Sequence, residues 1–316
     1  MTKLASKRYL WFGLSLLVIV PGLVSLLLFG VKLGIDFTGG TLWELKFERA
    51  VSSDQIQAVL ADNGFENTVV QRTGAEADHT FLIRMKELTE GSAEKQTIQN
   101  DLKAQAGPFT ELQFSTVGGA VSSEIRNRAI LAVAIASFGI LLYIAYAFRN
   151  TQNPLLYGIC ALVAMLHDVL VVIGVFSILG AIANVEIDAL FVTALLTVIG
   201  FSVHDTIVVF DRIRENLAKR VDPSFEEVVN YSLAQTIVRS VNTSLTVIFT
   251  LFALYLFGGS TTREFVLALL IGVVSGTYSS IFNASQLLVA WEKGEIQRFF
   301  KRFRGRGAGP AVAPSR

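Results

Sequence analysis

Residues 188–216 read DALFVTALLTVIGFSVHDTIVVFDRIREN, an apolar run that meets polar residues before it ends. Its first part is apolar enough for a membrane-spanning helix, which needs about 20 such residues. His204 and Asp205 fall inside the run, and Asp211 follows six residues after Asp205, or about 9 Å along a helix. If Asp211 marks the membrane surface, Asp205 is submerged. Because a charged side chain inside a membrane costs about 2.5–3.5 kcal/mol on insertion scales, Asp205 is a candidate functional residue.

The composition of the whole chain also indicates a membrane protein. Of its 316 residues, 52% are hydrophobic and 17% are charged, whereas a soluble domain usually carries about 25% charged residues. The net charge of +1 gives no reason to expect a nucleic-acid partner. The single cysteine, Cys160, excludes a disulfide within the chain.

Six stretches are long enough to cross a bilayer. We expect them near residues 10–30, 128–148, 155–180, 188–210, 240–257 and 265–290. The first is longer than the roughly 7–15 apolar residues of a cleaved signal peptide and has no A-x-A-like site after it, so we interpret it as a retained anchor.

Basic residues predict the orientation of these spans in the cytoplasmic membrane. Four segments hold 16 of the 27 Lys and Arg residues: the N-terminus, residues 149–153, residues 211–239 and the tail from Lys293. Short cytoplasmic loops carry an excess of such residues, so both termini are expected in the cytoplasm.

Four parts of the chain follow from this reading. We expect a tail and first helix at 1–33, an outer α+β domain at 34–124, spans two to six at 125–292, and a basic cytoplasmic tail at 293–316. Within the third part, residues 211–238 predict a cytoplasmic helical segment, broken at Asp222-Pro223-Ser224. Basic and aromatic residues in the tail favour contact with anionic lipids, with RNA or the ribosome as an alternative.

The outer domain shows a βαββαβ pattern, which is typical of a ferredoxin-like fold. Strands are expected at 41–47, 67–73, 79–85 and 109–117, and helices at 52–64 and 92–107. The glycines of GIDFTGGT (34–41) precede a strand and no lysine follows them, which disfavours a nucleotide site and favours a tight turn at the membrane surface. We find no metal-ligand cluster and no nucleophile–base pair in this domain, so we expect no enzyme activity and no cofactor.

Further polar groups lie within the expected spans. His167 and Asp168 fall in the third span, where a structural pairing and a proton relay are both open. The fifth span carries a polar stripe, formed by Arg239, Thr243, Thr246 and Thr250, with Asn242 beside it. We expect the stripe to face a protein interior or a wet cavity, although Arg239 could instead bind lipid phosphate. Small residues of the sixth span predict close helix packing: Gly272, Gly276 and Ser279.

Asp205 and Arg239 lie in consecutive spans and suggest a mechanism. If their polar faces meet, the guanidinium favours the ionised carboxylate, and if they separate, burial favours the protonated form. A carboxyl group that changes in this way can take up a proton on one side of the membrane and release it on the other. His204 lies about 100° from Asp205 around the helix, so its part is secondary.

Six motifs, in this order along the chain, resemble the SecF family of Sec translocase accessory subunits: GIDFTGGT, HDV, GFSVHDTIVVFDRIREN, RSVNTS, YLFGG and GTYSS. The resemblance implies a SecD partner with a similar six-span core, a relation to the RND transporters, association with the SecYEG channel, and use of the proton gradient to export unfolded preproteins. It also implies that Asp205 and Arg239 are the proton-linked pair, while His204 stands where the family often has asparagine. It leaves open whether the chain is separate or the SecF half of a SecDF fusion.

Three functions therefore compete. The first is a proton-driven export subunit, and the second is half of an RND-type transporter of small molecules or lipids. An outer domain of about 90 residues is small for a transporter's substrate pocket. The third is a scaffold without transport, in which neutral substitution of Asp205 would have no effect.

Overall fold

The computed structural model describes residues 4–73, 78–151 and 153–298. The chain divides into two compact units. The helical unit comprises residues up to 32, 133–185 and from 190 onward, and the sheet unit comprises 33–132 and 186–189. The tail beyond residue 298 lies outside the described residues, so its contact with lipid stays a prediction.

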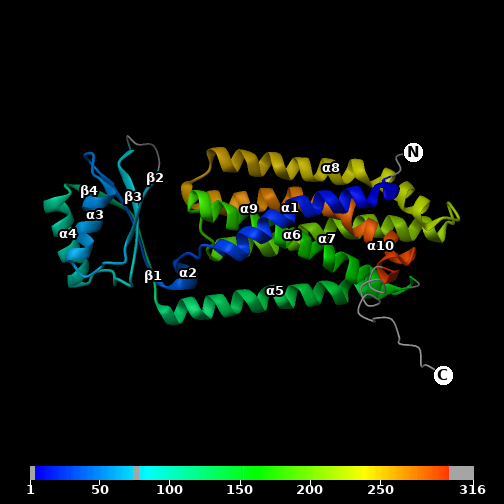
Figure 1. The fold of residues 1–316 in the computed structure, drawn as a ribbon, viewed down its shortest axis with the longest axis horizontal. Coiled ribbons are helices and arrows are strands. Elements are labelled where there is room, and N and C mark those ends of the chain that lie inside the picture. The colour runs from blue at the N-terminus through cyan, green and yellow to red at the C-terminus, as the bar shows by residue number, and fades with distance from the viewer. Residues whose placement is uncertain (1–3, 74–77, 152, 299–316) are drawn as a thin grey trace, which may run out of the picture. The chain divides into compact units, whose positions relative to one another are not determined.

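Six helical segments have the length and the apolar composition of membrane spans, which confirms the predicted number. They are η1 and α1 (Ala5–Lys7 and Arg8–Phe29), α5 (Gly119–Ala147), α6 (Pro154–Ala183), α7 (Ala189–Ala218), α8 (Phe225–Phe257), and the succession α9, η3 and α10 (Ser260–Ser279, Ser280–Ala284 and Ser285–Glu292) (Figure 1). Here η3 is a single π-helical segment within the sixth span. The six segments lie close to the stretches expected from hydropathy.

The predicted break at residues 222–224 separates two long helices. α7 runs on to Ala218 and α8 begins at Phe225, so the polar segment 211–238 consists of extensions of these two spans. Asn216 joins the extensions, since its side-chain amide donates to Ser232 Oγ at 2.9 Å and to Gln235 Oε1 at 3.0 Å. A buried amide with two acceptors keeps both of its N–H groups satisfied.

Helices α1 and α6 approach each other through small residues. A Cβ added to Gly22 would lie 2.8 Å from Gly174 Cα, and the reverse holds for Gly174. One turn away, the hydroxyl groups of Ser25 and Ser177 are 2.9 Å apart. Without a hydrophobic driving force between spans, such close backbone packing and hydrogen bonding are what hold helices together in a membrane.

The sheet unit contains every strand and helix expected of it, in the predicted order. These are β1 (Gly40–Phe47), α3 (Ser53–Asp62), β2 (Val69–Thr73), β3 (Thr80–Met85), α4 (Ala93–Gln105) and β4 (Phe109–Val117) (Figure 1). The strand order is β2-β3-β1-β4, and each neighbouring pair is antiparallel. Large apolar side chains from strands and helices, among them Trp43, Phe81 and Ile98, form its buried core.

The glycine-rich segment that precedes β1 makes a tight connection. It forms a single helical turn, α2 (Ile35–Thr38), followed by Gly39 and Gly40 with positive φ of 75° and 117°. A Cβ at Gly40 would lie 2.6 Å from the carbonyl oxygen of Met85 on β3, so only glycine fits there. Asp36 Oδ2 accepts the backbone N–H of Ala189 at 2.8 Å, which ties this turn to the start of α7.

Candidate functional site

Asp205 lies where three helices of the bundle meet. It projects from α7 and is 7% exposed. Ser240 of α8 donates a hydrogen bond to its Oδ1 at 2.7 Å, and Ser280 of η3 donates to its Oδ2 at 2.8 Å. An ionised carboxylate has about four acceptor positions. With two of them filled by serine hydroxyls, Asp205 retains room to take a proton.

Asp168 on α6 is held more completely. It is 1% exposed. Its Oδ1 accepts from Ser275 Oγ at 2.6 Å and lies 3.0 Å from His167 Nδ1. Its Oδ2 accepts from Ser202 Oγ at 2.5 Å and from Ser279 Oγ at 2.6 Å. Three serine hydroxyls therefore donate to this carboxyl group, and His167 Nδ1 lies within hydrogen-bond distance of its fourth acceptor position.

Consecutive residues of the sixth span link these two carboxylates. Ser279 ends α9 and binds Asp168, while Ser280 begins the π-helical segment and binds Asp205. Single π-helical turns within α-helices often occur at functional sites. A change in the hydrogen bonds of Asp168 therefore acts on Ser279, which is the chain neighbour of Ser280, the partner of Asp205.

The structure places Arg239 and the polar stripe on the outside of this chain. Arg239 is exposed, and among the described residues neither a hydrogen bond nor an ion pair joins it to Asp205. The neighbouring residue Ser240 makes that contact instead, because consecutive helical residues point about 100° apart. The rest of the stripe is also exposed: Asn242, Thr243, Thr246 and Thr250. The expectation that these side chains face a protein interior is therefore not met by this chain alone.

The remaining predicted residues have defined surroundings. His204 is exposed, on a different side of α7 from Asp205. Gly272 and Gly276 bring α9 against α7, since an added Cβ would lie 2.1 Å from Val198 Cγ2 and 3.0 Å from Ser202 Cβ, respectively. Ser275 and Ser279 of α9 reach Asp168 because α9 also packs directly against α6.

The sequence analysis did not identify the serines that bind the two aspartates. They are Ser202, Ser240, Ser275 and Ser280, together with Ser279, which was expected only to pack between helices, and all five are buried. A buried row along α8 recurs every four residues and could have signalled the inward face: Ser232, Thr236, Ser240 and Ser244. In the described part of the chain, no group of three or more His, Cys, Asp or Glu residues is placed to hold a metal ion.

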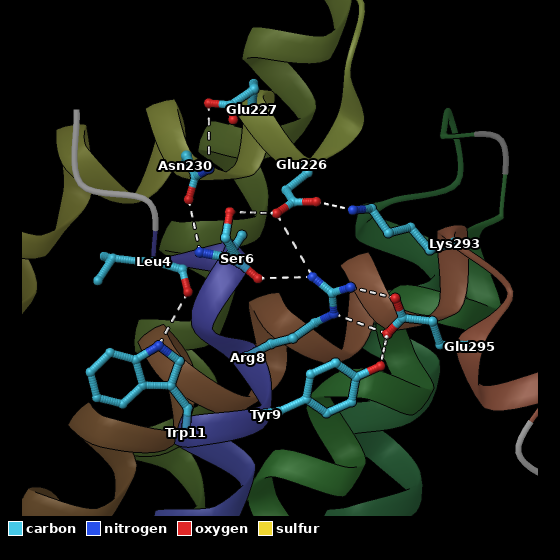
Figure 2. Close-up of polar contacts among 11 residues, drawn as sticks. Leu4, Ser6, Arg8, Tyr9, Trp11, Glu226, Glu227, Asn230, Lys293 and Glu295 are labelled. Carbon is cyan, nitrogen blue, oxygen red and sulfur yellow. Dashed lines mark hydrogen bonds and ion pairs between the residues drawn. The ribbon is translucent and has the colours of Figure 1, made fainter.

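A second polar cluster joins the first span to α8 and to the end of the sixth span (Figure 2). Arg8 Nε donates to Glu295 Oε2 at 2.9 Å, and its Nη2 also contacts Glu295. Arg8 Nη1 lies 3.8 Å from Glu226 Oε1, and Lys293 Nζ pairs with Glu226 as well. The backbone N–H of Ala5 donates to Asn230 Oδ1 at 2.8 Å. The Arg8–Glu295 contact is partly buried and bidentate, and bidentate arginine–carboxylate pairs are among the strong hydrogen-bonded ion pairs of proteins.

This cluster predicts that the stability of the chain depends on acidity. The hydrogen bond from Arg8 holds the pKa of Glu295 below its ordinary value of 4.5. A lowered folded-state pKa contributes stability that is present above the ordinary value and is lost as the pH falls through the folded one. We expect the melting temperature of the detergent-solubilised chain to fall more steeply below about pH 4.5 than in a Glu295→Gln variant.

The matched control for this prediction is Glu124→Gln, which removes an exposed ion pair with Arg128. Exposed pairs contribute little, so its melting profile should follow that of the unaltered chain. Identical profiles for the unaltered chain and Glu295→Gln would contradict a stabilising role for the Arg8–Glu295 contact.

Two family models match the chain. One, described as "Protein export membrane protein SecD/SecF, C-terminal", matches residues 97–294. The other, described as "SecD/SecF GG Motif", matches residues 24–51 and includes the glycine turn before β1. The first match contains both aspartates and all five serines that bind them.

Individual relatives extend this similarity over nearly the full length of the chain. The protein translocase subunit SecF of Thermobaculum terrenum is 59% identical over 302 residues, which cover 93% of this chain and 95% of the relative. That of Anaerolinea thermophila is 45% identical over 99% of this chain and 100% of the relative. The crystal structure of SecDF from Thermus thermophilus, a translocon-associated membrane protein, superposes with a TM-score of 0.79 at 34% identity. The match covers 92% of this chain and 38% of that longer one.

Proposed function

Because the chain belongs to the SecF family of protein translocase subunits, we propose that it is a proton-driven accessory subunit of protein export. In this proposal it acts in the cytoplasmic membrane with both termini in the cytoplasm. It pairs with a SecD-type subunit and helps a SecYEG channel in a late step of exporting unfolded preproteins. Its energy comes from the proton gradient rather than from ATP.

The position of Asp205 carries the proposal. Its carboxylate is buried among apolar spans and has two hydroxyl donors, with no cationic partner among the described residues. Burial of a carboxylate without a counter-charge favours its protonated form. When Asp205 gains a proton it still accepts from both serines, but more weakly, because hydrogen bonds to an ionised acceptor are about twice as strong as those to a neutral one. Proton uptake therefore alters the contact that α7 makes with α8 and η3.

Arg239 supplies a second state for Asp205. A rotation of α8 by about 100° would bring Arg239 to the place of Ser240. Opposite Arg239 the carboxylate is stabilised as an anion, and opposite Ser240 it takes a proton more readily. Each proton that crosses the membrane delivers about 2.3 kcal/mol per 100 mV of potential and about 1.4 kcal/mol per pH unit. This energy would be coupled to movement of the sheet unit on the outer side.

The exposed stripe on α8 supports a partner within the membrane. Polar side chains are costly against lipid, so helices that carry them usually pack them against other protein. The SecDF relatives are longer than this chain, which spans 38% of the entire Bacillus subtilis protein of that name. We propose that a SecD-type subunit covers Arg239 and Thr243 and makes the rotation of α8 dependent on its own state.

The sheet unit fits the ferredoxin-like class, to which we assign it from its strand order and βαββαβ succession. We propose that it is the part that meets the preprotein, while the basic tail binds anionic lipids. No nucleic-acid partner, cofactor or enzyme activity enters the proposal.

The proposed function can be tested in inverted membrane vesicles that export a model preprotein. A proton ionophore, added after ATP has been consumed, should stop the completion of export in vesicles that contain the chain and its partner. Vesicles that lack the chain should show no such proton-dependent phase. If both kinds of vesicle respond alike, the chain is not the site of coupling, and the scaffold or the transporter of small molecules or lipids becomes the better account.

A further inference from the structure

We propose that His167 is a second proton-accepting group of the helical unit, held in its working orientation by Asp168. This inference rests on the proposed function, because it adds a proton site to the one assigned to Asp205.

Asp168 determines which nitrogen of the imidazole carries the proton. Three serine hydroxyls donate to it, which leaves one of its four acceptor positions for His167 Nδ1 at 3.0 Å, and in this proposal that nitrogen is the donor. A hydrogen bond to an acceptor requires a proton on Nδ1. In the neutral ring Nε2 is then left as the bare, proton-accepting nitrogen. A carboxylate that orients a histidine in this way is the arrangement that makes histidine a base in catalytic triads.

Nε2 of His167 is buried and has no hydrogen-bond partner among the described residues. The His167 side chain is 10% exposed. A buried polar atom without a partner costs about 1–3 kcal/mol, so such an atom in a folded protein calls for an explanation. Acceptance of a proton, or of a hydrogen bond from a proton-carrying water, provides one.

His167 also borders two hollows of the helical unit. It lines one cavity of about 530 Å³ with residues of α1, α6 and α9, and another of about 370 Å³ with residues of α1, α6 and the sixth span. Ser15 of α1 lines both cavities as well, and its hydroxyl donates to Asn283 Oδ1 at 2.9 Å. Both volumes far exceed the roughly 30 Å³ of one water molecule. Their lining is mainly apolar, so a water molecule that enters would find its hydrogen-bonding partners at polar groups such as His167 and Ser15.

Few titratable groups surround His167. The titratable groups that face it are Asp168 on its own helix and Tyr278 on α9, whose ring stacks on the imidazole at 6.1 Å between centroids. From α1 and η3 it meets Ser15 and Asn283, which do not titrate. A proton from water binds the lone pair of Nε2 without breaking any bond in the chain. The resulting imidazolium is paired with the Asp168 carboxylate, and an opposite charge at this distance stabilises it.

Protonation at His167 also reaches Asp205. The imidazolium attracts Asp168 Oδ1 more strongly and so competes with Ser275 for that oxygen, and the resulting shift of the carboxylate changes the contact that its Oδ2 makes with Ser279. Ser279 immediately precedes Ser280, which binds Asp205. The π-helical turn thus connects the two proton sites, and His167 would control how readily Asp205 responds.

Nitrogen NMR of isotope-labelled histidine tests the first step directly. The chain has three histidines, so a His167→Asn variant identifies the signal of His167 by its loss. In lipid vesicles at high pH we expect a ring with the proton on Nδ1 and a bare Nε2, which becomes an imidazolium as the pH is lowered. A ring with its proton on Nε2, or one that stays neutral throughout the range in which the chain is folded, would overturn the proposal. This readout does not depend on secretion, so it holds or fails separately from the proposed function.

The second measurement uses secretion. His167→Asn keeps an amide N–H where Nδ1–H donates to Asp168 but removes the proton-accepting nitrogen. We expect proton-driven secretion to slow about tenfold and to lose part of its pH dependence, because positioned proton carriers typically contribute at least that much. The matched control is His79→Asn in the sheet unit, at a residue with φ of 48° that asparagine tolerates. Secretion by His167→Asn that matches this control at every pH would also refute the proposal.

Discussion

Cells in which this chain carries Asp205→Asn are expected to lose the proton-dependent part of preprotein secretion. Asparagine has nearly the shape of aspartate, and its oxygen can still accept a hydrogen bond from Ser240 or Ser280. It cannot take up a proton, however, so the difference between the protonated and the ionised state of residue 205 disappears. Proton transfer by a positioned side chain typically contributes about 100- to 10,000-fold, and we expect a loss of at least about 100-fold.

The matched control for this variant is Asp211→Asn on the same helix. Asp211 is exposed and pairs with Arg214 at 2.5 Å, so the change removes a surface ion pair and little else. Secretion is measured with a model preprotein after equal expression and equal assembly with the partner have been verified. Normal secretion by Asp205→Asn under these conditions would refute the coupling mechanism. Arg239→Met should reproduce the loss without unfolding the chain, since no described hydrogen bond or ion pair of the chain involves Arg239.

The variant Gly22→Leu is expected to separate α1 from α6. Even a Cβ at this position would lie 2.8 Å from Gly174 Cα, and the obstacle is backbone that cannot rotate away. Overpacking typically costs about 1–3 kcal/mol, and we expect the upper end because two helices must move apart. The control, Gly13→Leu on the same helix, meets nothing within 4 Å and should improve helix propensity without a clash.

Two measurements detect the separation of α1 from α6. The melting temperature in detergent should drop for Gly22→Leu and stay the same or rise for Gly13→Leu. In addition, cysteines placed at Ser25 and Ser177, whose hydroxyl groups are 2.9 Å apart, should form a disulfide in a Cys160→Ala background. The disulfide should form readily in the chain that keeps Gly22 and poorly in the Gly22→Leu variant. Equal crosslinking in both would show that the helices tolerate the larger residue.

Much of the fold could be predicted because it depends on local patterns. Long apolar runs marked the six spans, since a span must bury its whole length in lipid. In the sheet unit, alternating apolar residues marked the strands, and Ser52 marked the start of α3, where it forms a capping box with Gln55. Asp205 and Asp168 could also be identified, because an acid in an apolar run is conspicuous whatever surrounds it.

What surrounds those acids was decided by tertiary structure alone. Serine in a membrane helix often satisfies its hydroxyl on its own backbone, so nothing local distinguishes Ser280 from other serines, and the polar row that contains Ser240 does not show which group that row meets. A rotation of about 100° separates the inward Ser240 from the outward Arg239, and the packing of α8 on its neighbours sets that rotation. Likewise, Ser275 and Ser279 reach Asp168 because α9 packs directly against α6, the helix that carries this carboxylate. The sequence by itself determined which titratable groups lie within the membrane spans. Helix packing determined which hydroxyl groups bind them, because a hydrogen bond between two helices depends on the distance between those helices, which the sequence of neither helix specifies.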